Sequence, residues 1–474
     1  MNTEIRTDVA VIGAGSAGLH AVREVRRAQR DFLMIDRGPL GTTCARVGCM
    51  PSKVALHAGA EWSMRTSLAD IGVSGTESLS LDLSRTWAKL REQRDFFASS
   101  ATRKARTAAG DKLIEGAARF IEPTLIAVET AAGVQRIRAN AVVIATGSRP
   151  VMPAWLEPVR ERTITTDELF ELNTLPRSVG ILGLGAIGLE MGLALSRLGV
   201  RVVGADLAPN VAGIVDPVIG ARARERFGRE LELWLGAQTA VTKTDTGVRL
   251  SACDYSTEVD LLLAALGRRP NVDALGLQEA DFPLDARGTP LFDPATMQIG
   301  DLPVFIAGDA NADRPLMHEA ADEGAMAGYN AARQSPTHFA RKVSLGIAFS
   351  NPDVASVGAR FDHLDAQRIV IGTASGDKNG RARILGATDS LLRVYADATD
   401  GRLLGASMVA TGGEHLAHLL AWAIKRNETA HDLLALPFYH PVVEEMLQTA
   451  LQDIVSQLPA DTPYPVGLTP VDHP

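Results

Sequence analysis

Short apolar runs alternate with glycine-rich turns along the first half of the chain. The first such unit has an apolar run at 8–12, a glycine turn at 13–18 and a helical pattern that continues through Arg30. A second apolar run at 32–35 ends at Asp36. This order predicts a strand, a turn, a helix and a second strand, which together form the βαβ unit of a parallel sheet.

The same pattern returns later in the chain. An apolar run at 178–182 leads into a glycine turn at 183–188, a helix to Leu198 and a run at 202–205 that ends at Asp206. The two units predict an α/β fold with two Rossmann-like nucleotide-binding domains. A long helical pattern covers 84–109, and from about Val343 alternating strand patterns (391–396, 402–408) are mixed with helices at 414–426 and 442–457. The last section is therefore expected to be an α+β domain.

Composition narrows the choice of partners. The 474 residues are 46% apolar and 22% charged and carry a net charge of −8, with no block of like charge. This balance argues against nucleic acid or an anionic membrane surface as the main partner. The sequence contains no run of 18 consecutive apolar residues, so a membrane span is not expected. Three cysteines are too few for a disulfide scaffold, so a cytoplasmic protein is expected.

Glycine spacing indicates two dinucleotide sites. In such turns the glycines allow a tight bend, close approach of the backbone to a pyrophosphate and close packing of helix on strand. The first turn supplies Gly13, Gly15 and Gly18, and the second supplies Gly183, Gly185 and Gly188. An acid that ends the second strand accepts hydrogen bonds from a ribose and repels a 2′-phosphate. Asp206 therefore indicates NAD(H) rather than NADP(H).

Two cysteines lie close together in the segment 41–53. Cys44 and Cys49 are separated by four residues, and their sulfurs meet if the segment forms a distorted helical turn. A helix N-terminus, Arg46 and Lys53 would favour a thiolate there. We therefore predict a redox-active dithiol; the alternative of a metal site lacks further Cys or His ligands at suitable spacing. Cys253 is isolated and is expected to be an apolar core or edge residue.

At this point the chain resembles the flavin-dependent disulfide oxidoreductases that include dihydrolipoamide dehydrogenase and glutathione reductase. The most specific motif is the cysteine segment 41–53, and the similarity runs over nearly the whole chain. Further matching segments, in chain order, are Ala-Thr-Gly-Ser-Arg-Pro at 145–150, Ala-Leu-Gly-Arg-Arg-Pro at 265–270, Phe-Ile-Ala-Gly-Asp at 305–309 and His-Pro-Val-Val-Glu-Glu at 440–445.

The resemblance implies that FAD occupies the first glycine loop and NAD the second. Asp36 would bind the adenosine ribose of FAD, the backbone at Ala118 would lie near the adenine, and Asp309 would hold the ribityl chain. Lys53, paired with Glu190, would lie near the reactive edge of the flavin, although Glu190 could also lie on a solvated helix face. The remaining residues expected at the cofactors are Thr146, Gly147, Gly267 and Gly308.

His440 is the candidate base, because imidazole titrates near neutral pH and thiol–disulfide exchange needs a proton acceptor. Spacing alone allows Glu444 or Glu445 to orient the ring, and the family pattern selects Glu445. Pro441 is expected in the first turn of the helix that follows. The resemblance also implies a homodimer in which His440 reaches the disulfide of the other subunit.

The resemblance implies four segments: an FAD-binding part at 1–153, an NAD-binding domain at 154–270, a central FAD-binding part at 271–342 and an interface domain at 343–474. Four positions depart from the dihydrolipoamide dehydrogenase pattern: Thr42 replaces a glycine, Arg46 an asparagine, Phe438 a histidine two positions before His440, and Val442 a threonine two positions after it. Arg46 could favour an anionic disulfide or could point to solvent.

The leading hypothesis is a dihydrolipoamide dehydrogenase-like enzyme that passes electrons from a dithiol through Cys44–Cys49 and FAD to NAD⁺. Any lipoyl-carrying partner is then expected to be a separate protein. A second hypothesis is an NADH-dependent reductase of another small-molecule or protein disulfide. A third is a redox-sensing or assembly subunit that binds FAD and NAD with little turnover, against which the intact set Cys44, Cys49, His440 and Glu445 argues.

Overall fold

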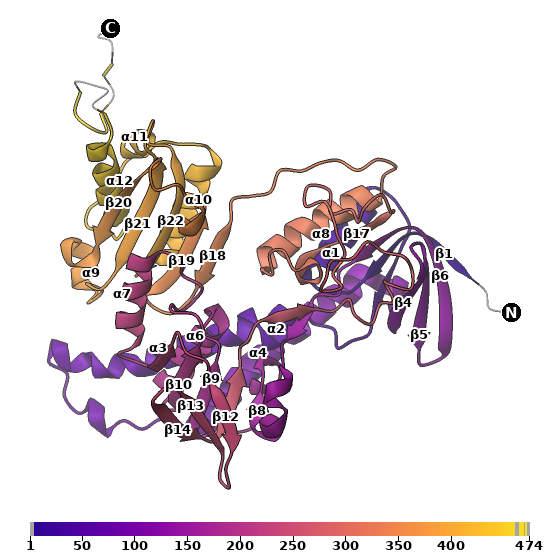
Figure 1. Cartoon of the computed structure of the whole chain (residues 1–474), viewed down its shortest axis with the longest axis horizontal. Coiled ribbons are helices and arrows are strands. Elements are labelled where there is room, and N and C mark those ends of the chain that lie inside the picture. Colours follow the sequence, from indigo (N-terminus) through magenta and orange to yellow (C-terminus); the bar gives the residue numbers. More distant parts are fainter. Residues whose placement is uncertain (1–3, 460–463, 469, 472–474) are drawn as a thin grey trace.

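The computed structural model describes residues 4–459, 464–468 and 470–471, and folds them into three units, each built on its own sheet (Figure 1). The N-terminal unit, in indigo with a salmon return segment, lies on the right in that view. The middle of the chain forms the lower unit, and the yellow C-terminal unit stands above it on the left. The α/β fold class with a separate C-terminal unit is confirmed.

The N-terminal sheet is mostly parallel. Strand β1 pairs in parallel with β2 and β6, and β17, which comes from much later in the chain, pairs in parallel with β6. An antiparallel extension through β5 and β4 continues the sheet beyond β6. The strands in sheet order are β3 (Leu113–Glu115), β2 (Phe32–Asp36), β1 (Ile5–Ile12), β6 (Gly133–Ile144), β5 (Leu125–Thr130) and β4 (Ala117–Glu122), with β17 (Val304–Ile306) beside β6.

Helix α1 (Ser16–Arg27) is shorter than expected, because the helical pattern through Arg30 is interrupted. Gln29 takes a left-handed backbone conformation, with φ of 53°. The amides of Gln29 and Arg30 bond back to the carbonyls of Arg26 and Val25, which closes the last turn. The chain then enters β2 directly.

Helix α8 (Met317–Ala331) packs closely against α1, since glycines replace bulkier residues at the contact. A Cβ on Gly324 would lie 2.2 Å from the carbonyl oxygen of Ala17, and one on Gly328 would lie 2.3 Å from that of Ala21. The two backbones therefore touch. This contact fixes the late segment, with its Gly308 turn, against the first glycine loop.

The middle unit is a fully parallel five-stranded sheet, in the order β11 (Glu232–Leu235), β10 (Arg201–Asp206), β9 (Ser178–Leu182), β15 (Leu261–Ala264) and β8 (Thr163–Ile164). Helix α6 (Ala186–Arg197) follows β9, and α7 (Pro217–Phe227) follows β10. An antiparallel sheet is formed by β12 (Ala240–Lys243), β13 (Val248–Ala252) and β14 (Tyr255–Val259). Strands β7 (Ser148–Pro150) and β16 (Arg268–Pro270) pair at the passage between the first two units.

The C-terminal unit is an antiparallel sheet with helices. Its strands, in sheet order, are β18 (Leu345–Ala348), β19 (Asp353–Gly358), β22 (Leu403–Ala410), β21 (Leu391–Asp397) and β20 (Ile369–Ser375). Its helices are α9 (Gly380–Ile384), α10 (Gly413–Lys425), α11 (Ala430–Leu434) and α12 (Glu445–Gln457). The expected helix at 442–457 begins only at Glu445, so Pro441 precedes it instead of lying in its first turn.

Three further helices, α2 (Thr43–Val47), α3 (Cys49–Ser63) and α4 (Leu83–Ala109), lie where the units meet. Ala55 and Leu56 of α3 and Trp87 of α4 belong to one core cluster with the β9 and α6 side chains and with Val354 and Val409 of the C-terminal sheet. The remaining short helices are α5 (Thr166–Leu169) and 3₁₀ turns at Met64–Thr66, Leu68–Ile71, Thr76–Ser78, Gly110–Lys112, Ala154–Arg162, Gly308–Asn311, Phe361–His363 and Gly376–Lys378.

A buried polar contact also joins the middle and C-terminal units. Asp216, the N-cap of α7, is completely buried and accepts hydrogen bonds from Arg393 at 2.6 Å and from the Tyr395 hydroxyl at 2.7 Å, both on β21. A buried carboxylate is stable only with such partners.

Across residues 4–459 and the short described tail segments, no helix is long and apolar enough to cross a membrane.

We predict that Gly328→Ala lowers the free energy of unfolding by about 1–3 kcal/mol, because the added methyl group would overlap the Ala21 backbone. Urea denaturation followed by circular dichroism measures the change. Gly380→Ala is the control, since nothing lies within 4 Å of a Cβ there. Equal midpoints for the two variants would contradict the close contact of α1 with α8.

Candidate active site

The two glycine loops have the same geometry. In each, the first glycine has a positive φ, and a Cβ on it would overlap the carbonyl oxygen of a neighbouring strand, at 2.2 Å for Gly13 and 2.5 Å for Gly183. A Cβ on the third glycine, Gly18 or Gly188, would lie 1.9 Å from the carbonyl oxygen of the first. The middle glycines, Gly15 and Gly185, face open space, so backbone amides are accessible to a ligand.

The two strand-end acids also match. Asp36 accepts hydrogen bonds from the amides of Ala14 and Gly38, both at 2.6 Å. Asp206 accepts them from Leu184 at 2.5 Å and Ala208 at 2.8 Å. Each carboxylate therefore holds its glycine loop beside the end of the neighbouring strand.

Three cavities lie along these loops. The Asp36 cavity, about 310 Å³, is lined among others by Gly13, Gly15, Asp36, Ala118, Thr146 and Gly147. The cysteine cavity, about 270 Å³, is lined by Gly15, Cys44, Cys49, Lys53, Glu190, Gly308 and Asp309. The Gly185 cavity, about 930 Å³, is lined by Gly185, Gly267, Arg268 and Asp309. Gly18, Gly183, Gly188 and Asp206 line none of the three and act through the packing and hydrogen bonds above.

The Asp36 and cysteine cavities share Gly15 and Gly147, so one extended ligand can occupy both. The Thr146 hydroxyl is buried and has no hydrogen-bond partner among the described residues. A buried polar atom of this kind needs a partner, and a bound dinucleotide would provide one. The accessible loop amides, Asp36 and this hydroxyl fit FAD.

Lys53 and Glu190 are brought together from different units. Lys53 Nζ donates to both carboxylate oxygens of Glu190, at 3.0 and 2.8 Å. Glu190 is only 4% exposed, so it does not lie on a solvated helix face. Its Oε1 also accepts a hydrogen bond from the Phe349 amide of the C-terminal unit at 2.9 Å. The cation is therefore held at the cysteine cavity.

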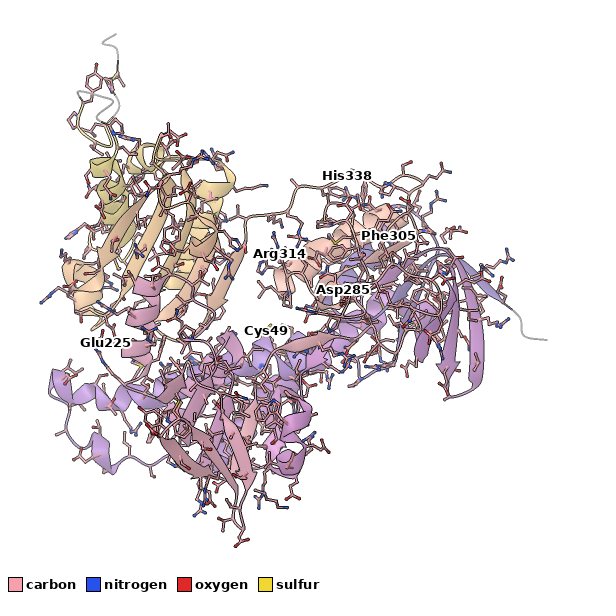
Figure 2. All side chains as sticks on the ribbon, viewed as in Figure 1. Cys49, Glu225, Asp285, Phe305, Arg314 and His338 are labelled. Atoms are coloured by element: carbon pink, nitrogen blue, oxygen red, sulfur yellow. The ribbon has the colours of Figure 1, made fainter. Side chains whose placement is uncertain are left out.

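The expected distorted turn at the cysteines is a break between two helices at Gly48. Cys44 is the second residue of α2, and Cys49 is the first residue of α3. Both are present as thiols. Figure 2 places Cys49 near the middle of the molecule, where the three units meet.

The two thiols differ in acidity. A hydrogen bond from the Cys44 thiol, together with the Lys53 charge and the Cys49 amide, lowers the pKa of Cys49 to about 7, although burial opposes the shift. The same hydrogen bond, aided by burial, raises the pKa of Cys44. The reduced pair therefore carries its negative charge on Cys49, next to Lys53.

His440 and Glu445 contact each other at a distance from the cysteines. His440 Nδ1 lies 2.9 Å from Glu445 Oε1, and Glu445 Oε2 accepts the Val442 amide at 3.0 Å. These bonds hold 440–442 in a turn, which is why α12 begins later than expected. The hydrogen bond with His440 lowers the pKa of Glu445. The His440 side chain is 79% exposed and lies outside the cysteine cavity of its own chain.

Sequence reasoning missed residues that support Asp309. The Ser148 hydroxyl bonds Asp309 Oδ2 at 2.6 Å, and Arg268 Nε donates to the same hydroxyl at 2.7 Å. Buried Glu323 accepts the Gly308 amide at 2.8 Å. Ser148 and Arg268 lie in motifs that the sequence identified, but no sequence pattern pointed to Glu323.

The described residues contain no group of three or more His, Cys, Asp or Glu side chains that could hold a metal ion.

We predict that alkylation of Cys49 by iodoacetamide in the reduced protein rises steeply as the pH passes about 7, because the thiolate is the nucleophile. Lys53→Met should shift this rise to higher pH, since the favourable charge is lost. Mass spectrometry of the labelled peptide gives the rate. Lys104→Met, an exposed position on α4, is the control, and identical profiles for both variants would exclude a role for the Lys53 charge.

Comparison with known proteins agrees with this geometry. The family described as pyridine nucleotide-disulphide oxidoreductase matches residues 7–334, and its dimerisation domain matches 345–451. A dihydrolipoyl dehydrogenase of Bacillus subtilis is 27% identical over 466 residues, which cover 94% of this chain and 96% of that protein. Dihydrolipoyl dehydrogenase 3 of Pseudomonas aeruginosa is 27% identical over 464 residues, with 94% and 97% covered.

Two solved structures share the fold. The copper(II) complex of the HOCl-induced flavoprotein disulfide reductase RclA from Escherichia coli has a TM-score of 0.80 at 21% identity, and LpdA from Mycobacterium tuberculosis has 0.81 at 22%. Each comparison covers 94% of this chain and 99% of the other. With both family domains matched, the chain belongs to the pyridine nucleotide-disulphide oxidoreductase family and is an FAD-dependent, NAD-linked oxidoreductase.

Proposed function

We propose that this enzyme is a dihydrolipoyl dehydrogenase, which oxidises a dihydrolipoyl dithiol and reduces NAD⁺. The observation that carries the proposal is the cysteine pair beside Lys53–Glu190, in a cavity that shares Asp309 and Arg268 with the Gly185 cavity. The dihydrolipoyl dehydrogenases to which the chain is similar over nearly its full length support the choice of dithiol. Asp206 supports NAD⁺ over NADP⁺.

In this proposal, residues of the Asp36 cavity and the cysteine cavity would hold FAD, and the second glycine loop would hold NAD. Asp36 binds the adenosine ribose, Asp309 binds the ribityl chain, and the backbone at Ala118 lies near the adenine. Lys53 stabilises negative charge near the reactive edge of the ring. The other residues proposed for the FAD site are Gly13, Gly15, Gly18, Thr146, Gly147 and Gly308, and those for the NAD site are Gly183, Gly185, Gly188, Asp206 and Gly267. Of these, Gly18, Gly183 and Gly188 shape the loops through backbone packing and line none of the three cavities.

The dithiol step uses side chains of the protein alone. His440 removes a proton from one substrate thiol, and the resulting thiolate attacks the Cys44 sulfur of the Cys44–Cys49 disulfide. The bond between the cysteines breaks, and Cys49 leaves as a thiolate, which its low pKa and Lys53 favour. The second substrate thiol then displaces Cys44, so the substrate becomes a disulfide and both cysteines are reduced. When bound, FAD would supply the electron transfer from this dithiol to NAD⁺, with Lys53 beside its reactive edge.

The exposed position of His440, outside the cysteine cavity of its own chain, supports a site completed across a dimer. The matched dimerisation domain covers His440 and Glu445. We propose that His440 of the partner subunit faces Cys44 and that Glu445 orients its ring. We further propose a separate lipoyl-carrying protein as substrate, a cytoplasmic location, and a division of the chain into segments 1–153, 154–270, 271–342 and 343–474.

The direct test is NAD⁺ reduction by dihydrolipoamide with purified, FAD-loaded protein. We expect turnover with NAD⁺ that exceeds turnover with NADP⁺ by roughly tenfold or more, since Asp206 disfavours a 2′-phosphate. Equal rates with both nucleotides would contradict the role of Asp206. Reduction of the enzyme by NADH without any turnover of dihydrolipoamide would instead favour another disulfide as the substrate.

We predict that His440→Gln lowers dihydrolipoamide oxidation by roughly 10²- to 10⁴-fold, as expected for loss of a general base. Oxidation of NADH by ferricyanide should be unchanged, because it does not need the dithiol step. The matched control is His363→Gln, because His363 is also an exposed histidine that lies beside an acidic residue. A comparable loss in both activities would show that the variant damages the fold or the cofactor site.

A further inference from the structure

Arg46 lies between the two cysteines in the sequence, but the structure turns it away from them. Successive residues of a helix advance by about 100°, so residues two apart lie on nearly opposite faces. Cys44 and Val47 of α2 line the cysteine cavity, whereas Arg46 lines the Asp36 cavity. Helix α2 therefore borders both cavities, with the Cys44 side chain facing one and the guanidinium-bearing side chain facing the other.

The Arg46 side chain runs back along the segment before α2. Its Cδ lies 3.3 Å from the position that a Cβ would take on Gly41, which also lines the Asp36 cavity. The side chain is half-buried, and its guanidinium makes no hydrogen bond or ion pair with the residues that the structure describes. Asp167 lines the same cavity, and burial raises its pKa; the charge of Arg268 and, more weakly, that of Arg46 oppose this shift.

Other features of the Asp36 cavity suit an anionic ligand. The N-terminus of α1, a helix of 12 residues, opens into it beside Gly15. Of the other arginines that line the cavity, Arg149 is paired with Asp273 at 2.6 Å, and Arg37 lies directly after Asp36. Arg46 therefore brings an unpaired cation to the α2 side of the cavity, together with the unpartnered Thr146 hydroxyl. A guanidinium fork matches phosphate oxygens in charge and geometry.

We propose that Arg46 binds a phosphate group of the dinucleotide in the Asp36 cavity, and is not a recognition group for an anionic disulfide. This inference rests on the FAD site of the proposed function. Arg46, the charged residue within the cysteine motif, then helps to retain the cofactor. Its positive charge does not lie on the Cys44 side of α2.

The test is FAD affinity of the deflavinated full-length protein, measured by quenching of flavin fluorescence. Arg46→Gln should weaken FAD binding by roughly 10- to 100-fold, as expected for loss of a hydrogen bond to a charged group. Affinity for ADP, measured by competition with FAD, should fall similarly, because ADP carries the pyrophosphate without the flavin. Arg103→Gln on α4, an exposed arginine outside the cavity, should leave both affinities unchanged.

Other outcomes separate the competing roles. Unchanged FAD and ADP affinities would overturn the inference. If, in that case, FAD-saturated Arg46→Gln turned over glutathione disulfide more slowly than the wild type but lipoamide at the same rate, Arg46 would instead serve an anionic substrate. Failure of the wild-type protein to bind FAD would instead overturn the proposed function. If Arg46→Gln does not fold, Arg46→Lys keeps the charge without the fork, and the inference then requires an FAD affinity below that of the wild type that falls further as salt increases.

Discussion

The buried carboxylate of Glu190 is the point on which the arrangement of the three units depends. It is carried by α6 of the middle unit, accepts two hydrogen bonds from Lys53 on the cysteine-bearing helix α3, and accepts the Phe349 amide of the C-terminal unit. A carboxylate that is 4% exposed is costly unless it is paired in this way. Because its two partners, Lys53 and the Phe349 amide, lie outside the middle unit that carries it, Glu190 is fully paired only when the units are assembled, and its carboxylate holds the ammonium group of Lys53 beside the cysteines.

The glycine loops impose a second constraint, which is steric. In both loops the first glycine touches the backbone of a neighbouring strand and the third touches the first, so no side chain can be added without moving backbone. The close contact of α8 with α1 extends this packing to the Gly308 turn. Asp309 and Arg268 line both the cysteine cavity and the Gly185 cavity, and the Ser148 hydroxyl joins them through hydrogen bonds.

Charge is divided unequally across the cysteine site. A hydrogen bond from the Cys44 thiol, together with Lys53 one turn along the helix, lowers the pKa of Cys49, whereas that hydrogen bond and burial raise the pKa of Cys44. The residue that would accept a substrate proton lies elsewhere, on the exposed turn before α12. In the proposed function, a single chain would thus hold the cysteines and Lys53 together, while His440 lies exposed outside that cavity.

The sequence alone determined the two βαβ units, the redox pair and the family, because glycine spacing, strand-end acids and the cysteine motif act over a few residues and need no knowledge of distant contacts. It also identified Glu190 as a partner for Lys53, but only through the resemblance. Tertiary structure decided the rest. Helix ends at Arg27 and Glu445 depended on a left-handed Gln29 and on bonds from the Glu445 side chain. The direction of Arg46 and the support of Gly308 by Glu323 depended on which segments face one another, and local periodicity carries no information about contacts between residues far apart in the chain.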